Sequence, residues 1–273
     1  MFKAFLYLFT FICIQFAVQF TVVAFYALVS CLSAEELSAW CEELSAWWNV
    51  GTMVGSSLIT IIVFVAAHWF VPSRSYIRSR PWDVLLWSAI AAIGAIVPSM
   101  ALQELMPEWT GWVRDLVEST EEQLADLMQV GPAGYMVIAM LPPLVEEMVF
   151  RGAILRVLLL CQPGRKWLMI ALSAFIFALV HINPAQMPHA FLIGLLIGWM
   201  YMRTGSIIPG VVYHWTNNTI AYVMFHLAHN PNSVGDLFGP GLRPVLLAVA
   251  FSLCILLPAL FQLHLRMKPA QKA

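Results

Sequence analysis

The chain has 273 residues, of which 61% are hydrophobic and only 11% are charged. This composition, with a mean hydropathy of +0.80, excludes an ordinary soluble domain and predicts a membrane protein. The formal net charge of −1 gives no indication of nucleic-acid binding, so we expect no nucleic-acid partner.

Eight apolar segments are predicted to be transmembrane helices, each of which needs about 20 residues. The first segment is too long for the hydrophobic region of a signal peptide, so we expect it to be retained as a helix. In chain order the predicted spans are residues 4–31, 50–71, 82–102, 133–160, 167–182, 187–202, 207–229 and 242–263. The expected fold class is therefore an all-α, polytopic membrane helix bundle.

The lysine and arginine residues support a count of eight spans. With eight spans every cationic group falls on one side of the membrane except Arg114 and Arg243, and the acidic loops fall on the other side. The groups on the cationic side are Lys3; Arg74, Arg78 and Arg80; Arg156, Arg165 and Lys166; Arg203; and Arg266, Lys268 and Lys272. Because cations are enriched in cytoplasmic loops, we expect both termini to be cytoplasmic, in a multi-pass protein of the plasma membrane (the inner membrane in a bacterium).

Two segments on the acidic side are predicted to form interfacial helices. The sequence "EELSAW" occurs at residues 35–40 and again at 42–47, and its tryptophans suit the headgroup region. The stretch 104–129 is acidic with spaced Leu, Val and Trp residues, and predicts a second amphipathic helix. Neither segment is expected to carry chemistry.

Glu146, Glu147 and Arg151 lie within the fourth predicted span, where charges are costly and mark a functional site or a buried ion pair. Glu147 and Arg151 are four residues apart and face each other on a helix, whereas Glu146 points about 100° away. An ion pair that stabilises helix packing is the simpler explanation of Glu147 and Arg151. Glu146 has no cation three or four residues away, so it is a candidate proton acceptor.

Three further polar residues lie in later spans. His181 ends the fifth span, while His214 and Asn218 share one face of the seventh. Each alone has a structural explanation, either as an interfacial histidine or as a hydrogen bond between helices. Gly205 and the pair Pro209–Gly210 predict a break and a kink near the start of the seventh span, which would open room for a polar cavity.

Taken together, Glu146, His181, His214 and Asn218 could hydrolyse an amide. A carboxylate and an imidazole can hold and deprotonate a water molecule, and a second imidazole and an amide can stabilise the resulting oxyanion. No Ser or Cys in this set lies beside a base, so a direct nucleophile is not expected. Two histidines and a glutamate would also suit zinc, so a zinc site at Glu146, His181 and His214 is the alternative.

These residues lie in three motifs that resemble those of a known family. The sequences "EEMVFR", "FALVH" and "HWTNN" are similar to the E-E-x-x-x-R, F-x-x-x-H and H-x-x-x-N motifs of the CAAX-protease and bacteriocin-processing family, also called Abi or type II CAAX prenyl endopeptidase-like. The resemblance extends from Gly134 to Tyr222 and implies an intramembrane endopeptidase with its active site in the helix core. It further implies that Glu146 activates water with the aid of His181, while His214 and Asn218 form the oxyanion site.

The resemblance also implies supporting roles and a division of the chain. Glu147 and Arg151 would support the site electrostatically, and His189 is an additional imidazole with no expected role. Because the family's motif works without a bound ion, we expect no metal and no other cofactor. Residues 1–130 would be N-terminal transmembrane helices with interfacial loops, 131–229 the CAAX-protease-like catalytic core, and 230–273 a C-terminal transmembrane helix with a short cytoplasmic tail.

The expected partners are the lipid bilayer and a peptide or protein substrate, which could itself be membrane-associated. The main alternative is a non-catalytic immunity or scaffold protein that keeps the motifs for packing. A proton- or metal-coupled transporter could use the same Glu and His residues, but no inverted repeat is visible across the spans.

Overall fold

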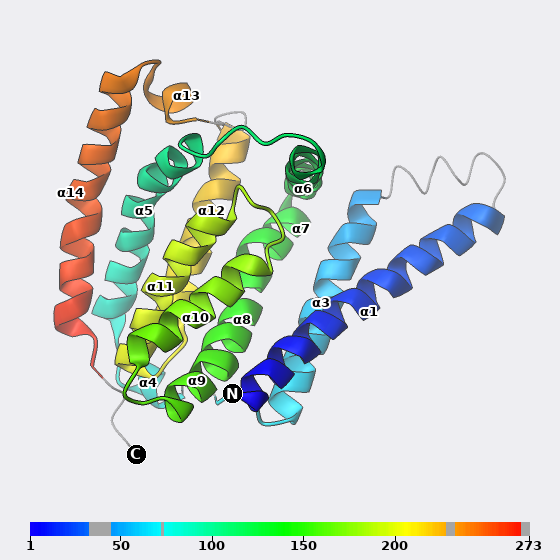
Figure 1. The fold of residues 1–273 in the computed structure, drawn as a ribbon, viewed down its shortest axis with the longest axis horizontal. Helices are drawn as coiled ribbons and strands as arrows, with labels where there is room; N and C mark the ends of the chain where they lie inside the picture. The colour runs from blue at the N-terminus through cyan, green and yellow to red at the C-terminus, as the bar shows by residue number, and fades with distance from the viewer. Residues whose placement is uncertain (33–44, 72–73, 228–232, 269–273) are drawn as a thin grey trace.

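The computed structural model describes residues 1–32, 45–71, 74–227 and 233–268, and every regular element within these ranges is helical. The long helices pack side by side in one bundle, with α1 and α14 at opposite edges, and α1 begins at the same end of the bundle at which α14 ends (Figure 1). In chain order the elements are α1 (Phe2–Leu32), α3 (Ser45–Ala66), α4 (Arg74–Arg78), α5 (Trp82–Glu104), α6 (Trp112–Gln129), α7 (Pro132–Tyr135), η1 (Met136–Met140), α8 (Leu141–Glu146), η2 (Glu147–Leu155), α9 (Arg156–Cys161), α10 (Lys166–Leu179), α11 (Met187–Thr204), α12 (Ile208–Leu227), α13 (Val234–Phe238) and α14 (Leu242–Arg266).

Each of the eight ranges predicted as spans is helical over most of its length. Among the described residues, four helices are long and apolar enough to cross a membrane: α1, α3, α5 and α14. The helix α10 is equally apolar in character but shorter. The chain is thus an integral membrane protein built as an all-helical bundle, while the number of spans stays a prediction. The end of the seventh predicted span, residues 228–229, lies outside the described residues.

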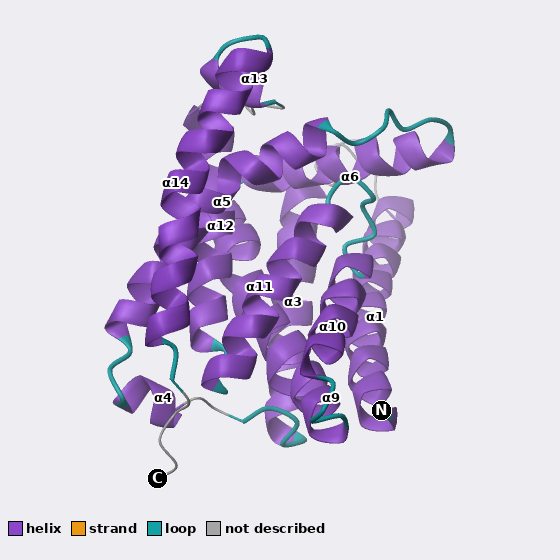
Figure 2. Cartoon of the chain, turned by 60° about the vertical axis from the view of Figure 1, so that its left-hand side comes forward, coloured by secondary structure: helices purple, strands orange, loops and turns teal. Residues whose placement is uncertain are grey.

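The acidic stretch after α5 forms the amphipathic helix α6, as predicted. It lies across one end of the bundle rather than along it (Figure 2), and it buries Val117, Leu127 and Met128. An amphipathic helix in this orientation is typical of a membrane interface. The first "EELSAW" copy, predicted to start the other interfacial helix, lies outside the described residues.

The fourth predicted span is a continuous helical segment, from α7 to α9, that contains two π-helical stretches, η1 and η2. Pro142 and Pro143 lack the backbone N–H groups that an α-helical or π-helical bond to the carbonyl of Ile138 would need. The side chain of Asn218, on α12, instead donates a hydrogen bond to that carbonyl at 3.0 Å. The prolines therefore create an acceptor that ties α12 to this segment.

Small residues let the helices around η2 approach closely. A Cβ added to Gly194 on α11 would lie 2.8 Å from the Cβ of Ala174 on α10, and one added to Gly210 on α12 would clash with Ile197 on α11. Close approach at small residues is a common way to pack helices in membranes. It brings α10, α11 and α12 against η2, whose residues are all buried.

Gly205 ends α11 in the left-handed conformation, with a φ of +67°, so the predicted break before the seventh span is confirmed. The predicted kink at Pro209–Gly210 is wrong. Pro209 lies in the first turn of α12, where its missing N–H has no intrahelical acceptor and a proline is tolerated without bending the helix.

At the edge of the bundle, α5 and α14 cross closely at Gly94. A Cβ there would lie 2.7 Å from the backbone nitrogen of Leu256. Pro98, inside α5, removes the N–H that would bond to the carbonyl of Gly94. The hydroxyl of Ser252 on α14 donates to this carbonyl at 3.0 Å.

Candidate active site

Glu147 and Arg151 form a fully buried ion pair, as predicted from their spacing. Arg151 Nη1 lies 3.1 Å from Glu147 Oε1, and the two side chains are 1% and 0% exposed. Arg151 Nη2 also donates to the carbonyl of Gly194 at 3.4 Å. A buried pair of this kind is strongly destabilised when one partner is removed, because the other charge is left uncompensated.

His214 joins this ion pair to the second glutamate, a connection that the sequence did not predict. Its Nδ1 lies 3.2 Å from Glu147 Oε1, and its Nε2 lies 4.0 Å from Glu146 Oε2. A carboxylate can only accept, so Nδ1 of His214 carries the hydrogen. The buried imidazole therefore presents its Nε2 to Glu146.

Glu146 is unpaired with any arginine or lysine of the described chain, as its position on the helix predicted. Its side chain is 24% exposed, but its Oε2 atom is buried and accepts no hydrogen bond from the described residues. An acceptor atom held in this way costs free energy unless something bonds to it. Glu146 Oε2 is thus available to a water molecule or a substrate near His214.

The ring of Phe177, on α10, lies at the centre of the site. The guanidinium of Arg151 lies 4.3 Å from its ring centroid, a favourable cation–π contact. The imidazoles of His181 and His214 lie edge-on to it, with centroid distances of 4.8 Å and 6.0 Å. Phe177 therefore brings His181 and His214 to one ring, as expected if they share a site.

His181 lies in the turn that follows α10, and its tautomer is set by its partner. His181 Nδ1 is 2.8 Å from the carbonyl of Phe177, which can only accept, so Nδ1 carries the hydrogen. In the neutral ring Nε2 then has a free lone pair. His181 is consequently suited to accept a proton at Nε2 rather than to donate one.

The turn after His181 is strained and is held by a residue that sequence reasoning missed. Ile182 has a φ of +57°, which is unfavourable for a β-branched residue. Asn183, only 1% exposed, accepts from the N–H of Ala185 at 2.9 Å and donates to the hydroxyl of Thr120 at 2.8 Å. Thr120 lies on α6, so this amphipathic helix is bonded to the turn that carries His181. The separation of 63 residues left no local signal of this contact.

The amide of Asn218 has two partners. Its Nδ2 donates to the carbonyl of Ile138 at 3.0 Å, and its Oδ1 accepts from Asn217 at 3.2 Å. A primary amide carries two N–H groups, so one N–H of Asn218 is not used by the bond to Ile138. The predicted oxyanion role of Asn218 can thus be fulfilled only by this second N–H.

The additional imidazole, His189, lies near both other histidines of the site. It lies in the first turn of α11, where His181 and His214 are among its titratable neighbours. His189 was expected to lie near the site without a required role, and no hydrogen bond to its ring occurs among the described residues.

The positions of the histidine and acidic side chains can be compared with those that a zinc site would need. Within the described ranges, no three His, Cys, Asp or Glu side chains converge as metal ligands do. His214 Nδ1 is held by Glu147 and His181 Nδ1 by a backbone carbonyl, so only their Nε2 atoms would be free to bind a metal. The absence of a metal requirement stays a prediction.

A comparison with known protein families found a match. Residues 129–220 match the family model described as type II CAAX prenyl endopeptidase Rce1-like, and the matched region contains all three motifs. No curated protein and no solved structure matches the chain. Residues 129–220 of this integral membrane protein are therefore similar to the type II CAAX prenyl endopeptidase Rce1-like family, a family of proteases.

Proposed function

We propose that this chain is an intramembrane endopeptidase that hydrolyses a peptide bond with a water molecule activated by Glu146. The observation that carries the proposal is the pairing of a buried, unbonded carboxylate oxygen, Glu146 Oε2, with an imidazole nitrogen 4.0 Å away, His214 Nε2. A base and a donor at this separation can both contact one reacting group that lies to the side of the pair.

The chemical steps follow from the hydrogen bonds of each side chain. Glu146, aided by Nε2 of His181, removes a proton from water as the water oxygen attacks the scissile carbonyl carbon. His214, protonated and held at Nδ1 by Glu147, donates its Nε2–H to the oxyanion, and the second N–H of Asn218 donates as well. The carbon–nitrogen bond then breaks, and the proton held by Glu146 passes to the leaving amine.

We further propose that the eight helical segments all span the membrane, with both termini cytoplasmic. Three of the long apolar helices, α1, α3 and α5, pack against the helices that carry the site residues. Reporter fusions after Leu44 and after Ser75 test this topology, because they should report the outside and the inside respectively. The same side for both fusions would contradict the topology.

The proposed substrate is a peptide or protein cleaved near its membrane-proximal end, of the CAAX type or another type. A site buried within a helix bundle favours substrates that are themselves held at the membrane. No metal or other cofactor is required by the proposed steps. The protein would act in the plasma membrane, the inner membrane if the source is bacterial.

The alternative is a non-catalytic immunity or scaffold protein of the same family. The substitution Glu146→Gln separates the two, because it keeps the shape of the side chain and removes the base. The deciding experiment compares membrane peptides from cells that carry the wild type with those from cells that carry Glu146→Gln. Peptides cleaved only with the wild type would support the endopeptidase, whereas identical peptides with an intact cellular phenotype would favour the scaffold.

A further inference from the structure

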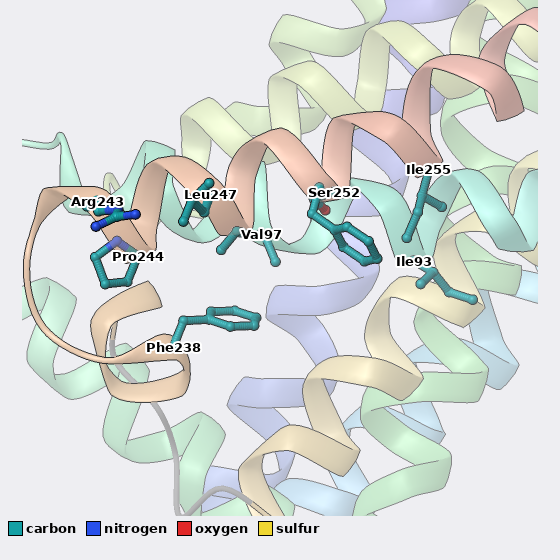
Figure 3. Close-up of a pocket in the computed structure, with 10 residues that line it drawn as sticks. Ile93, Val97, Phe238, Arg243, Pro244, Leu247, Ser252 and Ile255 are labelled. Atoms are coloured by element: carbon teal, nitrogen blue, oxygen red, sulfur yellow. The ribbon is translucent and has the colours of Figure 1, made fainter.

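A long apolar groove lies on the edge of the bundle, away from the proposed active site. It has a volume of about 650 Å³ and is bounded by α5, α13 and α14 (Figure 3). Apart from Ser252 and Arg243, every lining residue is apolar, and the hydroxyl of Ser252 is already bonded to Gly94. The groove shares no residue with the site described above.

The walls of the groove expose large hydrophobic side chains. Leu247 and Phe251 on α14 are 61% and 72% exposed, and Phe238, which projects toward the groove from α13, is 50% exposed (Figure 3). Both α5 and α14 are apolar enough to cross a membrane. These side chains therefore face lipid tails, and a concave apolar surface of this kind can hold a single acyl chain in place.

The length of the groove corresponds to one leaflet. It runs along α14 from Arg243 to Ile255, which at 1.5 Å per residue is about 18 Å. One leaflet of the hydrocarbon core is about 15 Å thick. Val97 lies beside Leu247 and Ile93 beside Ile255 (Figure 3), so α5 lines the groove along the same depth, and Arg243 lies at the level of the headgroups.

Arg243 is the charged residue of the groove, and it makes no ion pair within the described part of the chain. The other cation on the predicted outer side, Arg114, is paired with Glu118 at 3.6 Å. A guanidinium binds phosphate oxygens through two parallel N–H groups. The location of Arg243 at the end of an apolar groove is therefore complementary to a phosphate attached to an acyl chain.

We propose that this groove binds one anionic phospholipid, with its phosphate on Arg243 and one acyl chain along the face formed by Leu247, Phe251 and Ile255. The short helix α13 closes the headgroup end of the groove. It is anchored to α5 by a hydrogen bond from the N–H of Val234 to the carboxylate of Glu104. The site is independent of the proposed protease activity.

Native mass spectrometry of the full-length protein tests the proposal. The protein is released from vesicles that contain equal amounts of phosphatidylglycerol and phosphatidylcholine. We expect the wild type to retain one lipid per chain with a preference for phosphatidylglycerol. In Arg243→Gln this preference should fall by roughly fivefold, the contribution of one cation near an anionic lipid.

Two further variants make the test specific. Arg114→Gln removes the other outer cation and should leave the preference unchanged. Ala248→Phe fills the groove and should remove the bound lipid of either type. An unchanged preference in Arg243→Gln would overturn the proposal, as would a protein that retains no lipid and instead pairs with a second copy through this face.

Discussion

At two places in the described part of the chain, a side chain from a neighbouring helix donates to a helical carbonyl that a proline has left without its usual donor. At the crossing of α5 and α14, Pro98 frees the carbonyl of Gly94, and Ser252 donates to it. Beside the proposed active site, Pro142 and Pro143 free the carbonyl of Ile138. There Asn218 of α12 is the donor.

The two donor groups, the hydroxyl of Ser252 and the amide of Asn218, differ in the number of hydrogens that remain free to donate. A serine hydroxyl has one hydrogen, so the bond to Gly94 uses all of the donor capacity of Ser252. The amide of Asn218 has two hydrogens, and one is left for another acceptor. The hydrogen bond at the α5–α14 crossing therefore serves packing alone. The corresponding bond at the site also serves packing, but it leaves one N–H of Asn218 free to donate.

The acidic residues extend this contrast. In the crossing, the proline-freed carbonyl of Gly94 is paired, but at the site Oε2 of both Glu146 and Glu147 is buried and bonded to no described residue. Unpaired buried oxygens are costly. Their presence beside His214 is consistent with the proposed site, where a water molecule or a substrate would bond to them.

The largest expected effect follows from removing the base at the site. Glu146→Gln should reduce hydrolysis by about 10²–10⁴-fold, the usual contribution of a general base. The amount of folded protein should hardly change, because Glu146 makes no ion pair with Arg151. Cleavage of a peptide identified by the membrane proteome comparison measures the first effect, and thermal unfolding measures the second.

Glu147→Gln is the matched control at the neighbouring position. It leaves Arg151 buried without a partner and should destabilise the fold by about 3–5 kcal/mol. It also removes the negative charge beside His214 Nδ1, which stabilises a protonated imidazole, so any folded protein should be less active. A stable, fully active Glu147→Gln protein together with an unfolded Glu146→Gln protein would reverse the assigned roles.

The second effect compares the two proline-freed carbonyls directly. Asn218→Ala should slow turnover by roughly 10²–10³-fold if the free N–H donates to the oxyanion. It should also destabilise the protein by about 1–3 kcal/mol, because the carbonyl of Ile138 loses its donor. Turnover of folded protein and the free energy of unfolding are measured on the same preparation.

Ser252→Ala is the control for that comparison. It should lower the free energy of unfolding by a similar amount, about 1–3 kcal/mol, without slowing the turnover of folded protein. Equal losses of turnover in the Asn218 and Ser252 variants would show that both residues act only in packing.

A smaller effect is expected at the contact between α6 and the turn that carries His181. Thr120→Val removes the acceptor for Asn183 and should lower kcat by roughly three- to tenfold, the equivalent of one hydrogen bond. KM should change little, because Thr120 does not contact the proposed reacting groups. The kinetic constants of purified protein are the measurement.

Thr120→Ser tests whether the hydroxyl is the cause. It keeps the oxygen that accepts from Asn183 and should restore most of the lost kcat. If Thr120→Ser is as slow as Thr120→Val, the methyl group and not the hydrogen bond matters at this position, and Thr120 does not position His181.

The helices and the Glu147–Arg151 pair were predictable because they depend on local spacing. Apolar length indicated the eight helical segments, and a separation of four residues placed Glu147 beside Arg151. The hydrogen bond from Asn218 to the carbonyl of Ile138 was not predictable, since it joins residues 80 positions apart. The tautomers of His181 and His214 also depend on contacts that sequence spacing does not contain.

The predicted kink at Pro209 failed for a similar reason. A proline bends a helix only where it removes a bond that the helix would otherwise make, and this depends on where the helix begins. Since α12 starts at Ile208, Pro209 lies in the first turn and removes nothing. The sequence alone placed the start of that helix within several residues, which is too coarse to distinguish the two outcomes.

The smallest expected effect is that of metal removal. Activity should persist after exhaustive chelation of the purified protein, and elemental analysis should find well under one zinc per chain. The reason is that an amide such as that of Asn218 is a poor zinc ligand but a good oxyanion donor. His214, moreover, lies between Glu147 and Glu146 in a way that suits a protonated imidazole, which cannot bind a metal.

A stoichiometric zinc whose removal stops the reaction and whose return restores it would overturn this prediction. His181 and His214 would then be ligands through their Nε2 atoms, the only ring nitrogens not already bonded. Glu146 would be either the third ligand or the base for a metal-bound water. Asn218→Ala distinguishes this case as well. If a metal held the oxyanion, this substitution should lower the stability as Ser252→Ala does. It should slow turnover far less than the roughly 10²–10³-fold expected if Asn218 is a direct donor.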